Sequence, residues 1–120
     1  MVMEDDKQRV RQERIRALND EFRRRVGTGS TGQYLATVGV AQLPGPTVFR
    51  LWEQVRDYSD FTPDNDPYGE HDFGAFEAGD LGRLFWKIDY YDVNREYGSE
   101  DPSDPEKTTR VLTLMRDFEY

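Results

Sequence analysis

The sequence predicts a small α+β domain in which about three helices pack on a small antiparallel sheet of about three strands. Two patterns predict this class: apolar residues recur at helical spacing in three segments, and a β-hairpin pattern occupies the C-terminal half. The length of 120 residues suits a single domain. The predicted order of the elements is α-β-α-β-β-α.

The first predicted helix covers residues 4–26, because Ile15, Leu18 and Phe22 recur at helical spacing. Its first ten residues are nearly all polar. We therefore expect residues 1–13 to form a polar helical extension and residues 14–120 to form one α+β domain. The glycine-rich residues 27–32 end this helix and predict a flexible connector.

The next elements are predicted from local patterns of the same kind. The alternating residues 33–40 are rich in β-formers and predict a strand. Pro44-Gly45-Pro46 predicts a turn and the start of a helix that ends near Tyr58. A capping box at residues 103–106 predicts a last helix, whose apolar residues are Val111, Leu112, Met115 and Phe118.

A β-hairpin is predicted from residues 71–77 and 83–92, which flank a turn. If facing residues have numbers that sum to 160, Glu77 lies opposite Arg83, a pair of opposite charge that favours this register. One face is then expected to belong to the core, with Phe76, Leu84, Trp86, Ile88 and Tyr90. The other face is expected to be polar and aromatic, with Tyr91 beside the pairs His71–Asp89, Phe73–Lys87 and Ala75–Phe85.

The charge is uneven along the chain, which holds 16 Lys and Arg, 24 Asp and Glu, and no Cys. Most of the excess acid, and most of the aromatic rings, lie in residues 57–106, which predicts an ordered domain with a negative face. Such a face attracts basic protein surfaces and repels nucleic acid. Without Cys or a long apolar run, we expect a soluble, cytoplasmic protein with no disulfide and no membrane contact.

Two groups of residues are candidates for chemistry. In the first, Asp89 orients the His71 ring as an acid/base pair and Lys87 stabilises negative charge; the alternative is a cross-strand ion pair beside a half-exposed histidine. In the second, Asp64, Asp66, Gly69 and Asp72 match part of a calcium loop; the alternative is ordinary turn chemistry of Asp and Asn. Neither set is complete, so we assign no catalytic residue, no metal site and no cofactor.

Two further segments are distinctive, residues 61–74 (FTPDNDPYGEHDFG) and residues 85–92 (FWKIDYYD). Both resemble a bacterial family of uncharacterised proteins, domain of unknown function 3768, as do residues 14–20 (RIRALND) and 109–113 (TRVLT). The resemblance extends from about Arg14 to Tyr120. It implies a small bacterial protein, often carried on mobile elements, and supplies neither an activity nor a catalytic residue.

The composition and the hairpin together favour a non-catalytic protein-interaction or regulatory module whose partner is a protein with a basic surface. DNA mimicry by an anti-defence factor of mobile elements is one concrete version. The alternatives are a small enzyme that depends on His and carboxylates, a divalent-metal-binding protein, and an assembly module that pairs through its basic N-terminal helix. The predicted interaction surface consists of Asp64, Asp66, Tyr68, Glu70, His71, Asp72, Phe73, Phe85, Lys87, Asp89 and Tyr91.

Overall fold

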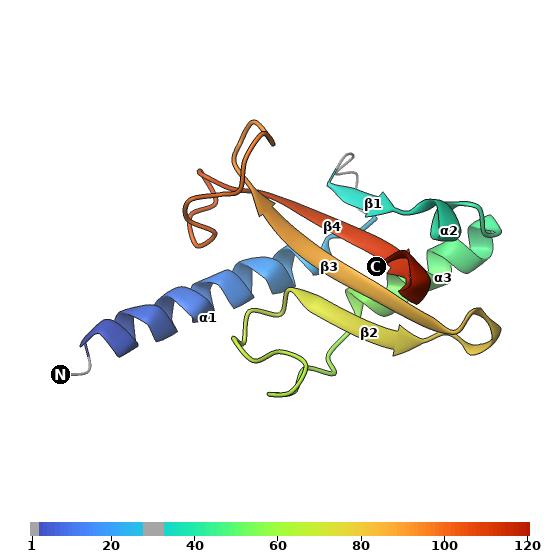
Figure 1. Cartoon of the computed structure of the whole chain (residues 1–120), viewed down its shortest axis with the longest axis horizontal. Helices are drawn as coiled ribbons and strands as arrows, with labels where there is room; N and C mark the ends of the chain where they lie inside the picture. Colours follow the sequence, from blue (N-terminus) through green and yellow to red (C-terminus); the bar gives the residue numbers. More distant parts are fainter. Residues whose placement is uncertain (1–2, 28–32) are drawn as a thin grey trace.

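The computed structural model describes residues 3–27 and 33–120 as an α+β fold, with three α-helices and one four-stranded sheet (Figure 1). The helices are α1 (Met3–Arg24), α2 (Val38–Ala41) and α3 (Gly45–Arg56). The strands are β1 (Tyr34–Ala36), β2 (Phe73–Glu77), β3 (Arg83–Tyr91) and β4 (Thr109–Arg116). Two 3-10 turns complete the fold, η1 (Gly79–Leu81) and η2 (Asp117–Glu119). The α+β class is confirmed, and the order of the elements differs from the prediction.

The sheet is mixed and not purely antiparallel. Its strand order is β1-β4-β3-β2, in which β1 pairs with β4 in parallel and the other neighbours are antiparallel. The fourth strand is β4, which lies in the region where a helix was predicted. Of the predicted connector 27–32, only Gly27 belongs to the described residues.

The hairpin of β2 and β3 has the predicted register. Glu77 pairs with Arg83 and Phe73 with Lys87, and the residues between them follow the same rule. The predicted core face is confirmed as well, because Leu84, Trp86 and Ile88 are buried, and Phe76 and Tyr90 pack against the same cluster. This register could be predicted because a strand alternates its side chains between two faces.

The predicted last helix is wrong, because residues 109–116 form the strand β4. Its apolar residues are spaced as on a helix, but β4 lies between β1 and β3 and is buried on both faces. A strand in that position has a nearly continuous apolar run, which periodicity cannot distinguish from a buried helix. The residues of the predicted capping box form a loop, in which the Ser103 hydroxyl donates to the Asp101 carboxylate at 2.6 Å.

The predicted strand 33–40 is correct only for Tyr34–Ala36, because α2 begins at Val38. The Glu119 carboxylate ends the strand here. It accepts hydrogen bonds from the Thr37 hydroxyl at 2.6 Å and from the Gly39 amide at 2.9 Å, and so fixes a helical turn. These hydrogen bonds hold the pKa of Glu119 below its usual range. Contacts across 80 and 82 residues are invisible to a local pattern.

The core lies between the helices and one face of the sheet. In Figure 1, α1 and α3 lie behind the sheet and η2 lies in front of it. The buried apolar cluster consists of Val40, Leu51, Val55, Leu84, Trp86, Ile88, Leu112 and Leu114. Among the described residues, no helix is both long enough and apolar enough to span a membrane.

Close packing at Gly74 on β2 gives the first prediction. A Cβ atom at Gly74 would lie 2.6 Å from Cε2 of Trp86 and 2.8 Å from Cε1 of Tyr58, distances that real Cβ atoms do not show. We expect Gly74→Ala to lower the free energy of unfolding by roughly 1–3 kcal/mol, because two packed rings must move. Urea unfolding measures this loss, with Gly45→Ala as the control, because a Cβ at Gly45 meets no atom within 4 Å. Equal stability of the two variants would contradict the packing described here.

Candidate functional site

The structure divides the predicted surface residues into two groups. Phe73, Phe85, Lys87, Asp89 and Tyr91 lie on the face of the sheet that points away from α1 and α3, which we call the open face. The other predicted residues lie in the loop that joins α3 to β2, residues 57–72, which we call the acidic loop. They are Asp64, Asp66, Tyr68, Glu70, His71 and Asp72.

The open face has an aromatic cluster at its centre. The rings of Phe73 and Phe85 lie 5.4 Å apart between centroids, and the ring of Tyr120 lies 6.0 Å and 5.5 Å from them. Tyr120 is 76% exposed, so one side of the cluster is accessible to solvent. Sequence reasoning missed Tyr120, because the residues before it were assigned to a helix.

Charged side chains lie beside these rings on the open face. The Lys87 ammonium is 3.0 Å from the Asp89 carboxylate, and this hydrogen bond raises the pKa of Lys87. Both side chains are more than one third exposed. The strand β3 positions them, because every second residue of a strand points to the same face. The polar and aromatic surface predicted from the hairpin register is therefore present on the strands, but His71 is not part of it.

His71 does not pair with Asp89, so the predicted acid/base pair is wrong. His71 precedes β2, and its backbone is in the left-handed region with φ 56°. This turn directs the ring toward α1, where Nδ1 lies 2.9 Å from Asp20, and the ring stacks on Phe61 with centroids 3.7 Å apart. Nε2 lies 3.6 Å from Asp66. His71 thus attaches the acidic loop to α1.

A buried polar network beneath α1 was not predicted. Asn19 is fully buried, and its Nδ2 donates to the Glu70 carbonyl at 2.9 Å and to the Tyr90 hydroxyl at 2.8 Å. The Tyr90 hydroxyl in turn donates to the Glu70 carboxylate at 2.9 Å. Arg110 Nε donates to Asn19 Oδ1 at 2.7 Å. Burial raises the pKa of Tyr90 well above its usual value, so this hydroxyl stays protonated as a donor. We call these four residues, Asn19, Glu70, Tyr90 and Arg110, the Asn19 network.

Arg23 makes a second buried polar contact one turn later on α1. It is 1% exposed, and it donates to Asp20 at 3.0 Å and to the Tyr58 carbonyl at 3.1 Å. Its guanidinium also lies over the rings of Phe61 and Trp86, at 5.3 Å and 5.4 Å. One signal for these residues exists in the sequence, because Asn19 and Arg23 follow the buried Ile15 at intervals of four residues.

The Asp72 carboxyl, where the acidic loop enters β2, is influenced by three other carboxylates. Burial raises the pKa of Asp72, and the negative charges of Glu70, Asp66 and Asp89 raise it further. Asp89 belongs to the open face, so the field of the acidic loop reaches that face. The ionised form of Asp72 is therefore disfavoured at this end of the hairpin.

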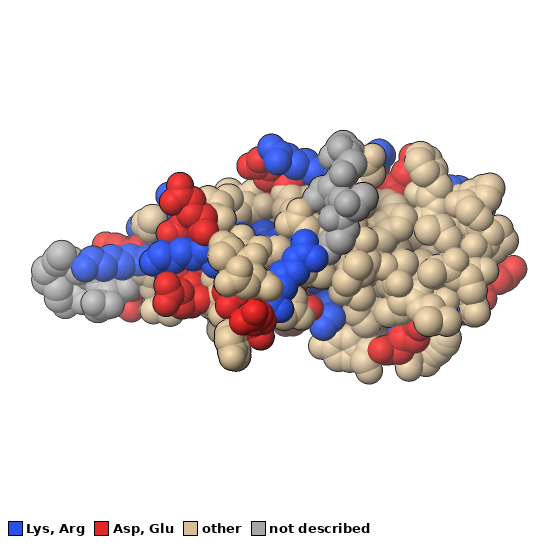
Figure 2. All heavy atoms as spheres, turned by 90° about the horizontal axis from the view of Figure 1, so that it is seen from above, with Lys and Arg blue, Asp and Glu red and all other residues tan. Residues whose placement is uncertain are grey.

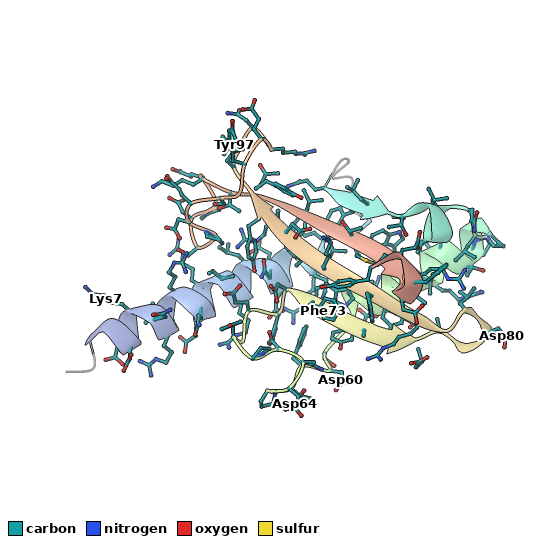
Figure 3. All side chains as sticks on the ribbon, in the orientation of Figure 1. Lys7, Asp60, Asp64, Phe73, Asp80 and Tyr97 are labelled. Atoms are coloured by element: carbon teal, nitrogen blue, oxygen red, sulfur yellow. The ribbon has the colours of Figure 1, made fainter. Side chains whose placement is uncertain are left out.

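The remaining acidic residues do not join this group. Figure 3 shows Asp60 and Asp64 at the tip of the acidic loop, Asp80 at the hairpin turn and Tyr97 in a third loop, at separate corners of the molecule. In Figure 2, acidic atoms likewise form several separate groups. The expected single negative patch is thus limited to the residues around Asp72.

The partial match to a calcium loop does not give a converging ligand set. Asp66 Oδ1 accepts the His71 amide at 3.2 Å, and the Asn65 side chain caps the Thr62 amide at 2.9 Å, as turn chemistry predicts. Within residues 3–27 and 33–120, no three side chains of His, Asp or Glu are placed to share a metal ion.

The Asn19 network predicts a large effect of a single buried substitution. Asn19→Leu keeps the branched shape of the side chain but leaves Arg110 Nε without its acceptor and removes one partner of the Tyr90 hydroxyl. We expect a loss of about 2–3 kcal/mol in the free energy of unfolding, measured in urea. Asn94→Leu, in the exposed turn after β3, is the control and should change stability by less than about 0.5 kcal/mol. A loss no larger than that of the control would show that the network is not structural.

Because the pKa of Asp72 is raised, we predict that replacing this carboxyl increases the stability of the fold in a pH-dependent way. The folded protein binds this proton more tightly than the unfolded chain does, so the ionised carboxylate lowers stability at neutral pH. We expect Asp72→Asn to raise the urea midpoint at pH 7. The gain should decline as the pH falls through the folded-state pKa, and it should vanish below 3.8, the ordinary value. Asp80→Asn in the hairpin turn is the control, and a gain for Asp72→Asn that does not depend on pH would contradict the assignment.

Comparison with known proteins places most of the chain in one family. The family described as "Protein of unknown function (DUF3768)" matches residues 36–119, and so the predicted resemblance is confirmed over that range. The match includes both distinctive segments, whereas residues 14–20 lie outside it. No curated protein and no solved structure matches the chain. Because the matched residues make up more than half of the chain, this protein belongs to the DUF3768 family.

Proposed function

We propose that this chain is a non-catalytic protein-interaction module that binds a basic protein surface through its open face. One observation supports the proposal above all others. The helices α1 and α3 pack on one face of the sheet, while η2 and Tyr120 lie against the other face and leave the Tyr120 ring exposed.

The open face has the composition of a binding surface. Tyr120 and Leu35 are 76% and 45% exposed, and the rings of Phe73 and Phe85 lie beside Tyr120. Aromatic rings are the side chains that most often contribute strongly to binding, because they bury a large area at a low cost in conformational entropy. Exposed apolar residues that lie together favour an interface more than scattered ones do.

The charge of the adjoining residues favours a basic partner. Asp89 lies on the open face, and the charges of Asp89, Glu70 and Asp66 all act on Asp72, where the acidic loop enters β2. Lys87 forms an ion pair with Asp89 on the open face, and the carboxylates of the acidic loop lie outside that pair. Complementary potentials of this kind speed association and select the partner.

The narrower hypotheses have less support. A DNA mimic that serves an anti-defence role on mobile elements needs carboxylates spaced like phosphates along one surface, whereas the acidic loop, the hairpin turn and the loop after β3 lie at separate corners. The enzyme hypothesis relied on a His71–Asp89 pair, and His71 instead binds Asp20. We therefore propose protein binding without assigning it a defence-related target.

Affinity capture from a lysate of the source cells, followed by mass spectrometry and a Kd measured with the purified partner, tests the proposal. We expect Tyr120→Ala to weaken binding about tenfold, because it removes an exposed ring of the open face. Tyr97→Ala is a matched control, since Tyr97 is 73% exposed in a different loop. We also expect binding to weaken steeply with added salt. Equal affinity of both variants, or binding that salt does not change, would contradict the proposal.

A further inference from the structure

A solvent-accessible cavity of about 200 Å³ lies away from the open face, between the C-terminal end of α1, the start of β4 and the loop before it. Its apolar wall is formed by Leu18, Phe22 and Pro105. The charged residues that line it are Arg25, Arg110 and Glu21. Two guanidinium groups in one small cavity suit an anionic ligand.

Arg110 is the residue of this cavity whose side chain is held rigidly in place. It is 6% exposed, and two of its nitrogens are held from behind, Nε by Asn19 Oδ1 at 2.7 Å and Nη2 by the carbonyl of Pro102. The Tyr90 ring lies 5.2 Å from the guanidinium carbon. These contacts fix the orientation of a planar fork, so little conformational entropy remains to be lost on binding a ligand.

The third nitrogen of Arg110 remains available. Nη1 has no hydrogen-bond acceptor among the described residues, yet it is not one of the buried polar atoms sealed from solvent. Nη1 is therefore accessible to solvent, and Arg110 is one of the residues that line the cavity. No described carboxylate forms an ion pair with Arg110, and burial lowers its pKa, which reflects the cost of a buried cation.

Arg25 and Glu21 line the solvent-exposed side of the cavity. Their side chains form an ion pair at 2.6 Å, and both are more than half exposed. An anion in the cavity would compete with the Glu21 carboxylate for Arg25. Burial raises the pKa of Tyr34 on β1, and the charge of Arg25 opposes part of this rise, so the charge of Arg25 acts within this region.

We propose that this cavity binds a small oxyanion, a carboxylate or a phosphate group, between the guanidinium groups of Arg110 and Arg25. Either oxyanion can accept charge-assisted hydrogen bonds from Nη1 of Arg110 and from the guanidinium of Arg25. The wall of Leu18, Phe22 and Pro105 accommodates an apolar body attached to the oxyanion. The proposal does not depend on the open face or on its partner.

The test is a titration of the whole chain with inorganic phosphate and, separately, with benzoate, at an ionic strength held constant with sodium chloride. Backbone amide NMR shifts of Gln33 and Thr108, which also line the cavity, report binding. We expect saturable shifts that concentrate there. Tighter binding of benzoate would assign the site to carboxylates with an apolar body, and tighter binding of phosphate would assign it to phosphate groups. No saturable shift with either anion would overturn the proposal.

Three exposed substitutions at the C-terminal end of α1 and just after it make the test specific. We expect Arg25→Gln to weaken anion binding about tenfold, because a charge-assisted hydrogen bond is lost. Glu21→Gln removes the competing carboxylate and should tighten binding several-fold. Arg24→Gln changes the net charge as Arg25→Gln does, but Arg24 does not line the cavity and should leave binding unchanged. If Arg25→Gln and Arg24→Gln have the same effect, the anion is attracted only by the general charge and the site does not exist.

Arg110→Lys tests the buried side of the cavity. It keeps the positive charge but removes the planar fork, and we expect anion binding to weaken about tenfold. Because Arg110 also belongs to the Asn19 network, circular dichroism must show that the variant folds. If it does not fold, the opposite effects expected for Arg25→Gln and Glu21→Gln decide the question. A folded Arg110→Lys variant with unchanged affinity would overturn the proposal.

Discussion

The hydrogen bonds of Asn19 connect α1 to parts of the chain that lie far from it in the sequence. One amide group joins α1 to the acidic loop, to β3 and to β4, through the Glu70 carbonyl, the Tyr90 hydroxyl and the Arg110 guanidinium. A buried amide needs partners for both its oxygen and its nitrogen, because an unsatisfied polar group in a low-dielectric core is costly. A single side chain therefore links α1 to the acidic loop and to both central strands of the sheet.

This constraint separates the molecule into two sides with different properties. On the helix side, His71, Phe61 and Arg23 attach the acidic loop to α1 and the core. On the other side, the same loop leads into β2 and brings Asp72 near Asp89 on the open face. The Asn19 network also orients Arg110 toward the oxyanion cavity. Both proposed binding surfaces thus depend on how α1 is held against the sheet.

Local patterns predicted the parts of the fold that depend on neighbours in the sequence. The hairpin register followed from strict alternation and from the pair Glu77–Arg83. The strand β4 was mistaken for a helix because it is buried on both faces, and the turn at α2 was missed because Glu119 is distant in the sequence. Asn19 and Arg23 were overlooked because polar residues on a helix usually face solvent. His71 was placed on the wrong side because a non-glycine residue with a positive φ leaves no clear mark in the sequence.

A double-mutant cycle between Asn19 and Tyr90 tests most directly whether this network organises the fold. Asn19→Ala, Tyr90→Phe and the double variant each remove groups of one hydrogen-bonded unit, in which the amide donates to the hydroxyl at 2.8 Å. If the unit acts as described, the losses in the free energy of unfolding are not additive, with a coupling of about 1 kcal/mol or more. Additive losses, equal within about 0.3 kcal/mol to the sum of the single variants, would contradict it.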